Sequence, residues 1–190
     1  MTALEARSIA RAGLLESYRS HGRTRWMEAT GRSMDPLIPA GSLLLIEFGA
    51  KPERIGEIVL FRRPSGAVAH RLVARLRVGD QVRLVAKGDG EALADPAFAP
   101  GAVLGVVRDV RLPDGRPGRA AIARRRGTAL ARVSRWSGNV ARIGGYAGRR
   151  APIQLRPGMI AAAYALSRVP TRFLTAMIPR FDRGAPAGRR

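Results

Sequence analysis

Residues 57–73 of this 190-residue chain read EIVLFRRPSGAVAHRLV and contain two of the apolar runs that decide its fold class. These runs, residues 57–61 and 67–73, are short and are separated by a Pro-Ser-Gly segment. Short apolar runs bounded by turn residues are typical of β-strands. Three more runs of this kind are residues 43–48, 81–86 and 103–110. Because no long helix is indicated between them, the five runs predict a mainly β fold, a small antiparallel domain ending near Leu112.

Helical and turn patterns set the limits of this β domain. Residues 3–20 mix apolar and charged side chains at helical spacing, which predicts an amphipathic N-terminal helix. Residues 113–118, PDGRPG, form a turn-rich break after the last predicted strand. We therefore expect an N-terminal helix within residues 1–24, a β domain over residues 25–115 and an arginine-rich helical extension over residues 116–190.

The net charge of the chain, +20, is concentrated in the extension. Residues 1–115 hold 17 basic and 13 acidic side chains, whereas residues 116–190 hold 17 basic and 1 acidic. This asymmetry favours an anionic partner for the extension, either nucleic acid or a phospholipid surface. A simple bias toward arginine codons is the alternative explanation.

Two helices are predicted within the extension. Over residues 130–143, apolar side chains including Trp136 recur at spacings of three and four, with arginines on the opposite side. Such a helix can lie in a membrane interface with its arginines toward lipid phosphates. It can equally pack its apolar stripe against the β domain or the second helix. That second stretch, residues 159–178, is expected to kink at Pro170.

The composition argues against several kinds of site and location. Without cysteine, the chain has no disulfide, thiolate nucleophile or zinc–thiolate site. Its two histidines, His21 and His70, argue against a multi-histidine metal centre, and we expect neither a metal nor a cofactor. The N-terminal residues lack the apolar run of a secretory signal, and Arg168 and Arg172 interrupt the best candidate for a membrane span. These features predict a cytoplasmic or peripherally membrane-associated protein.

Three segments of the predicted β domain carry groups able to do chemistry. They are residues 31–36 (GRSMDP), residues 69–71 (AHR) and residues 87–90 (KGDG), the last with Asp95 six positions after Asp89. Singly, each is ordinary, since serine and aspartate are common in turns and caps. Together they contain what acyl transfer needs: a hydroxyl nucleophile, a neutral imidazole to take its proton and a carboxylate to orient the imidazole.

In order and spacing, these segments resemble the signal peptidase I superfamily, in the Ser-His branch typified by the endoplasmic reticulum and archaeal enzymes. The family pattern has a Ser-Met-x-Pro box, a Gly-Asp-Ile-Val strand followed by a His-Arg-Val strand, a Lys-Gly-Asp box with a further aspartate, and a closing valine-rich strand. The matching segments, in that order, are residues 31–36 (GRSMDP), 56–59 (GEIV), 70–73 (HRLV), 87–89 (KGD) with Asp95, and 105–107 (GVV). The likeness covers roughly residues 29–110.

The resemblance implies a role for each matched polar residue. Ser33 would be the nucleophile, and its own backbone N–H would donate a hydrogen bond to the oxyanion. His70 would be the general base that later protonates the leaving amine, and Asp95 would orient it. Asp89 would support the site, either by holding its own turn or by contacting His70.

Neighbouring positions complete the family pattern or depart from it. Met34 resembles the methionine that lines the site in the family. Gly31 stands where many relatives carry a serine that helps to bind the oxyanion, so the backbone would have to suffice there. Ser42 replaces the usual aspartate after the turn glycine, and the pair at 90–91, Gly-Glu, replaces Asn-Asn. No N-terminal membrane anchor is expected before the serine box, which makes a small intracellular precursor peptide a further candidate substrate.

The related repressor-type self-cleaving proteases use a lysine base at the position that His70 occupies here. We therefore expect a Ser-His site, with a rate that rises through roughly pH 6 to 7. The implied function is that of a serine endopeptidase that removes a leader or signal segment from a precursor polypeptide. An anionic membrane surface is a candidate second partner, through the basic extension.

The sequence is also compatible with two other functions. The chain could be an arginine-rich protein that binds nucleic acid or a membrane surface and uses the β domain as a scaffold. No recognisable nucleic-acid-reading motif accompanies the arginines, which argues against nucleic acid as the partner. It could also be a pseudoenzyme that serves as a partner module, although intact Ser33, His70 and Asp95 argue against that.

Overall fold

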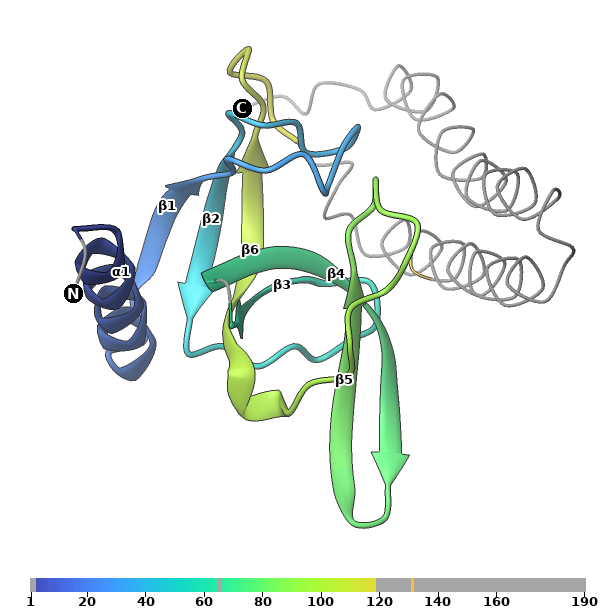
Figure 1. The fold of residues 1–190 in the computed structure, drawn as a ribbon. Coiled ribbons are helices and arrows are strands. Elements are labelled where there is room, and N and C mark those ends of the chain that lie inside the picture. The colour runs from blue at the N-terminus through green and yellow to red at the C-terminus, as the bar shows by residue number, and fades with distance from the viewer. Residues whose placement is uncertain (1–2, 65, 119–130, 132–190) are drawn as a thin grey trace, which may run out of the picture.

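The computed structural model describes residues 3–64, 66–118 and 131 of the chain. Within these residues the fold is one N-terminal helix and one antiparallel sheet of six strands, which confirms the mainly β fold class (Figure 1). The elements are α1 (Ala3–Ser20), β1 (Thr24–Glu28), β2 (Leu43–Phe48), β3 (Ile58–Arg63), β4 (Gly66–Val78), β5 (Gln81–Lys87), a 3-10 turn η1 (Pro100–Ala102) and β6 (Val103–Arg111). The helices predicted at 130–143 and 159–178 lie outside the described residues, apart from Ala131.

All five strands expected from the apolar runs are present, and β4 extends beyond its run to Val78. Strand β1 is the one that the sequence did not predict. Its residues, TRWME, form no apolar run, and only Met27 is half-buried. Pairing with β2 and the Arg111 guanidinium over the Trp26 ring, 4.6 Å from its centroid, hold β1 in place. These contacts come from segments distant in sequence, so local patterning could not indicate the strand.

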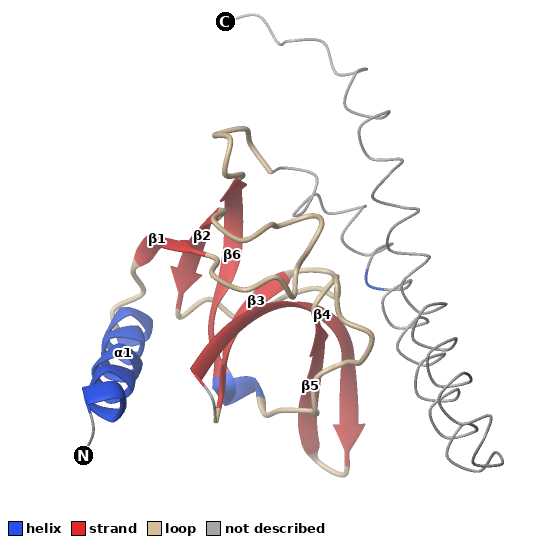
Figure 2. Cartoon of the chain, turned by 45° about the horizontal axis from the view of Figure 1, so that its top comes forward, coloured by secondary structure: helices blue, strands red, loops and turns tan. Residues whose placement is uncertain are grey.

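The strands lie in the order β1-β2-β6-β3-β4-β5, and every neighbouring pair is antiparallel. Strand β4 serves two partners: its first half pairs with β3, and its second half, from Arg71 onward, pairs with β5. Figure 2 shows the curvature of β4 that this sharing requires. Over residues 66–70 the edge of β4 opposite β3 has no strand partner within the described part of the chain.

The core lies on both faces of the sheet. Because successive side chains of a strand point to opposite faces, β3 sends Ile58 and Leu60 to one cluster and Val59 and Phe61 to the other. Helix α1 packs against β2, β4 and β6 on the first of these faces and contributes Leu15 to the core. Burial on both faces explains why the β3 sequence is almost continuously apolar.

Close contact between β2 and β6 leads to a prediction about Gly105. A Cβ atom at this position would lie 2.5 Å from the Glu47 carbonyl oxygen and 2.9 Å from Ile46 Cγ2. We expect Gly105→Ala to lower the free energy of unfolding by about 1–3 kcal/mol, measured by urea denaturation, because the neighbouring strand must move. Gly101→Ala is the matched control, since a Cβ there meets no atom within 4 Å. Equal stability of the two variants would contradict the close packing.

Candidate active site

Ser33 lies in the connection between β1 and β2, on a compact turn. The Asp35 amide donates to the Arg32 carbonyl at 3.1 Å, and the Ile38 amide donates to the Met34 carbonyl at 3.0 Å. Met34 and Ile38 are buried in the core, whereas Ser33 is half-buried. The buried residues anchor the turn, so the Ser33 side chain is presented from a supported backbone. The Asp35–Pro36 peptide bond is cis.

His70 and Asp95 come from two other parts of the fold. His70 lies on β4 opposite Val59 of β3 and is only 1% exposed. Asp95 lies in the connection between β5 and η1, where its amide donates to the Ala86 carbonyl at 2.8 Å. At the far end of this connection the Phe98 ring stacks on Phe61, with the centroids 4.1 Å apart. The connection is therefore fixed on both sides of the carboxylate.

The three side chains form one hydrogen-bonded row. Ser33 Oγ lies 2.8 Å from His70 Nε2, and His70 Nδ1 lies 2.8 Å from Asp95 Oδ2. Since a carboxylate only accepts hydrogen bonds, Nδ1 carries the ring proton and Nε2 is left to accept the proton of the Ser33 hydroxyl. This is the tautomer that a general base for serine needs.

Asp89 does not share this row. Its carboxylate accepts two hydrogen bonds from the Arg71 guanidinium, at 2.9 Å from Nε and 2.6 Å from Nη2. Arg71 also donates to the Gly56 carbonyl at 2.9 Å, and both charged side chains are almost fully buried. Of the two roles considered for Asp89, a hydrogen bond to His70 is therefore not made. A structural role for Arg71 was not predicted from the sequence, although Arg71 directly follows the histidine in the matched His-Arg box.

Burial and the Arg63 cation lower the pKa of His70 from its ordinary value to about 4. The Asp89 carboxylate acts in the opposite direction, and the Lys87 cation adds to the lowering. Arg63 also forms an ion pair with Asp95 Oδ1, on the far side of the carboxylate from the ring. The imidazole is thus neutral at pH 7 and able to accept a proton. With a His70 pKa of about 4, we expect the acidic limb of a rate controlled by this imidazole to lie below pH 6 to 7.

Lys87 is the lysine closest in sequence to the site, and it is also buried. It lies at the end of β5, opposite Arg71, and its Nζ donates to the Gly88 carbonyl at 3.3 Å. Burial lowers the pKa of Lys87. The group hydrogen-bonded to the Ser33 hydroxyl is nevertheless His70, in keeping with the Ser-His arrangement expected from the sequence.

The turn that begins at Gly88 packs directly on the serine turn. The Gly90 amide donates to the Ser33 carbonyl at 2.8 Å, and a Cβ on Gly88 would lie 2.5 Å from that same oxygen. Within the described residues the Ser33 amide donates no backbone hydrogen bond. Gly31 is exposed, and a Cβ there would meet nothing within 4 Å. There is therefore room at position 31 for the serine side chain that many relatives carry.

His70, Glu91 and Asp95 place possible metal-ligand atoms within 4.8 Å of one another. Both ring nitrogens of His70 are already engaged, by Ser33 and Asp95, and Asp95 is also paired with Arg63. The geometry of these donors is that of a proton-transfer row, so a metal ion would have to displace the hydrogen bonds that define it.

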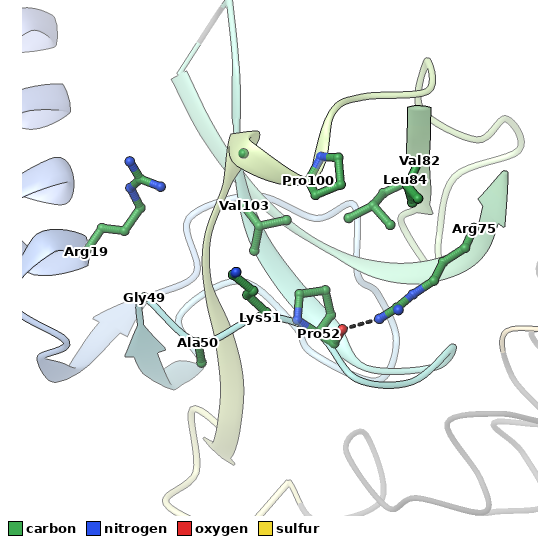
Figure 3. Close-up of a pocket in the computed structure, with 11 residues that line it drawn as sticks. Arg19, Gly49, Ala50, Lys51, Pro52, Arg75, Val82, Leu84, Pro100 and Val103 are labelled. Atoms are coloured by element: carbon green, nitrogen blue, oxygen red, sulfur yellow. Dashed lines mark hydrogen bonds between the residues drawn. The ribbon is translucent and has the colours of Figure 1, made fainter. Parts of the chain in front are cut away.

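Two of the cavities along the described sheet differ in their relation to the row. One, of about 200 Å³, is lined by Ser33, Met34 and residues of α1, β1, β2, β3 and β4. The other, of about 320 Å³, lies among Arg19, Lys51, Arg75 and apolar residues of β5 and β6 (Figure 3). No residue of the row lines the second cavity. The first cavity includes Ser33 in its lining, so a group bound there would lie beside the serine.

The fold and the row together are those of a serine-protease-like β domain. A family model described as Peptidase S24-like matches residues 5–108, which is more than half of the chain and includes Ser33, His70 and Asp95. The chain therefore belongs to the Peptidase S24-like family, and the resemblance to the signal peptidase and repressor-type superfamily is confirmed. No curated protein matches the chain. Within the described residues, no helix is long and apolar enough to span a membrane.

The buried Arg71–Asp89 pair yields a stability prediction. Asp89→Ala should lower the free energy of unfolding by about 3–5 kcal/mol, because it leaves a buried guanidinium without its carboxylate. Glu47→Ala is the control, since it breaks the half-exposed pair with Arg108 and should cost much less. Urea denaturation measures both variants. If Asp89→Ala were no less stable than Glu47→Ala, the pair would not have the structural role assigned to it.

The electrostatics of the row yield a second prediction. An NMR titration of the His70 ring should give a pKa near 4 in the parent protein. Arg63→Gln should raise this pKa toward the ordinary value of histidine, because it removes a cation whose field opposes ring protonation. Arg62→Gln, which alters the neighbouring side chain paired with Glu16, should leave the His70 titration unchanged. Equal His70 pKa values in the parent and Arg63→Gln would refute this account of the shift.

Proposed function

We propose that this protein is a serine endopeptidase that cleaves a leader or signal segment from a precursor polypeptide. The observation that carries the proposal is the row Ser33–His70–Asp95, with both hydrogen bonds at 2.8 Å. Three residues from distant parts of the chain meet in the order and tautomer that acyl transfer requires. Membership of a peptidase family supports the same reaction class.

The chemistry follows from the geometry of the row. Ser33 Oγ attacks the peptide carbonyl while its proton passes to His70 Nε2, and the Asp95 carboxylate stabilises the resulting imidazolium. The carbonyl oxygen becomes an oxyanion that accepts a hydrogen bond from the Ser33 amide. His70 then gives its proton to the leaving amine as the C–N bond breaks. In the second half-reaction His70 takes a proton from the water that attacks the ester. It returns this proton to Ser33 Oγ as the ester bond breaks, which releases the acid and restores both side chains.

A peptide substrate is supported by the backbone around the cavity at Ser33. One wall is the first half of β4, residues 67–69, whose edge opposite β3 is unpaired in the described part of the chain. The lining also contains Met27 and Glu28 of β1, which is an edge strand of the sheet. Unpaired strand edges bind extended peptides through main-chain hydrogen bonds. A polypeptide segment lying between these edges would reach Ser33.

Labelling with a serine-reactive fluorophosphonate tests the proposal. The parent protein should be labelled at one site, and Ser33→Ala should abolish the labelling because it removes the attacking oxygen. His70→Gln should slow labelling by about 10²–10⁴-fold, the usual contribution of a general base. Ser20→Ala, which removes a hydroxyl on the exposed end of α1, should label like the parent. Labelling that survives in Ser33→Ala would overturn the assignment.

A further inference from the structure

The cavity of about 320 Å³, which we call the Lys51 cavity, contains no residue of the proton-transfer row. In Figure 3, Arg19 and Arg75 lie at opposite ends of this space, and Lys51 lies between them. Its volume is at the lower end of the range of about 300–1,000 Å³ that is usual for small-molecule sites. The other side chains that line it are apolar: Ala50, Pro52, Val82, Leu84, Pro100 and Val103.

The charge around the Lys51 cavity is positive. Its lining contains Arg19, Lys51 and Arg75, and no carboxylate of the described residues lines it. Arg19 is paired with Glu16 on its own helix. Lys51 and Arg75, by contrast, form no ion pair within the part of the chain that the structure describes. These two cations are therefore available to an anion.

Hydrogen bonds hold the walls of the cavity in place. The Arg75 guanidinium donates to the Pro52 carbonyl, which joins β4 to the connection between β2 and β3 at one end of the space (Figure 3). On β5, Leu84 exchanges two backbone hydrogen bonds with Phe98, at 2.8 and 2.9 Å. A ligand would therefore meet a largely pre-formed site, as small molecules usually do.

Charge argues against a segment of this chain as the occupant. Residues 116–190 hold 17 basic and 1 acidic side chains, and the whole chain has a net charge of +20. The extension or a second copy of the chain would bring more positive charge to the cavity, and like-charge repulsion opposes such contacts. The lining instead suits a molecule that combines negative charge with apolar surface, because the cations would bind the first and the apolar side chains would cover the second.

We propose that the Lys51 cavity binds a small amphipathic anion. Its carboxylate or phosphate head lies beside Lys51 and Arg75, and its apolar body packs against Leu84 and Val103. The Arg75 guanidinium keeps N–H donors beyond the one that the Pro52 carbonyl accepts, and the Lys51 ammonium sits on a flexible stem that can follow the head group. Because the cavity is separate from the row, this inference does not depend on the proposed function.

Isothermal titration calorimetry of the full chain with octanoate, octyl phosphate, octanol and inorganic phosphate tests the proposal. Octanoate or octyl phosphate should bind about tenfold or more tightly than octanol and inorganic phosphate, because only these two probes combine a charged head with an apolar body. The tighter of the two identifies the head group. Binding of neither amphipathic anion, or binding of octanol or inorganic phosphate as tight as theirs, would overturn the proposal.

Charge-matched variants test the two cations. The double variant Lys51→Gln, Arg75→Gln should weaken binding of the tighter probe by about tenfold or more, because it removes both charged donors to the head group. The matched control is Arg54→Gln, Arg83→Gln, which removes the same charge from side chains outside the lining and should bind like the parent. Equal affinity of the two double variants would contradict the role given to Lys51 and Arg75.

Methyl NMR of the parent protein locates the bound probe. The signals of Val82, Leu84 and Val103 should shift on addition of the tighter probe, because these side chains line the Lys51 cavity. Those of Ile46 and Leu60, which line the cavity at Ser33, should stay in place. Shifts confined to Ile46 and Leu60 would overturn the assignment of the site.

Discussion

The alternation of side chains along β4 is the constraint on which the site depends. His70 and Arg71 are adjacent in sequence, so their side chains leave opposite faces of the strand, and both are buried. Each of these buried polar side chains needs a polar partner inside the protein. The connection that follows β5 supplies one aspartate to each of them. Asp95 serves the histidine and Asp89 serves the arginine. The shared strand thereby separates a proton-transfer row from a structural ion pair.

This division explains how a buried histidine stays neutral beside carboxylates. The charge of Asp89 is committed to Arg71, and the second oxygen of Asp95 is paired with Arg63. Burial and the surrounding cations therefore outweigh the carboxylates, and the pKa of His70 falls to about 4. A base must be unprotonated to act, and the low pKa leaves the imidazole unprotonated across the neutral range. The low pKa also makes the His70 imidazole a weaker proton acceptor, although the ring stays unprotonated throughout the neutral range.

Much of the site was predictable because its chemistry is local in sequence. The Ser-Met-x-Pro, His-Arg and Lys-Gly-Asp segments each keep their residue types at fixed spacing, and Ser33, His70 and Asp95 were identified from them. Two roles were predicted for Asp89, holding its own turn or contacting His70. The local sequence does not show which face of β4 an aspartate in the connection after β5 will contact. Strand β1 was missed because pairing with β2, rather than its own apolar content, makes it a strand.

The amino-acid sequence by itself determined the strand pattern, the order of the boxes and the presence of a histidine rather than a lysine as the candidate base, because periodicity and residue type are properties of short segments. Only the tertiary structure decided that Asp95 rather than Asp89 bonds to His70, that Arg63 helps to lower the pKa of the ring, and that Leu15 of α1 lines the same cavity as Ser33. Those outcomes depend on strand curvature, burial and the meeting of segments far apart along the chain, which no local pattern encodes.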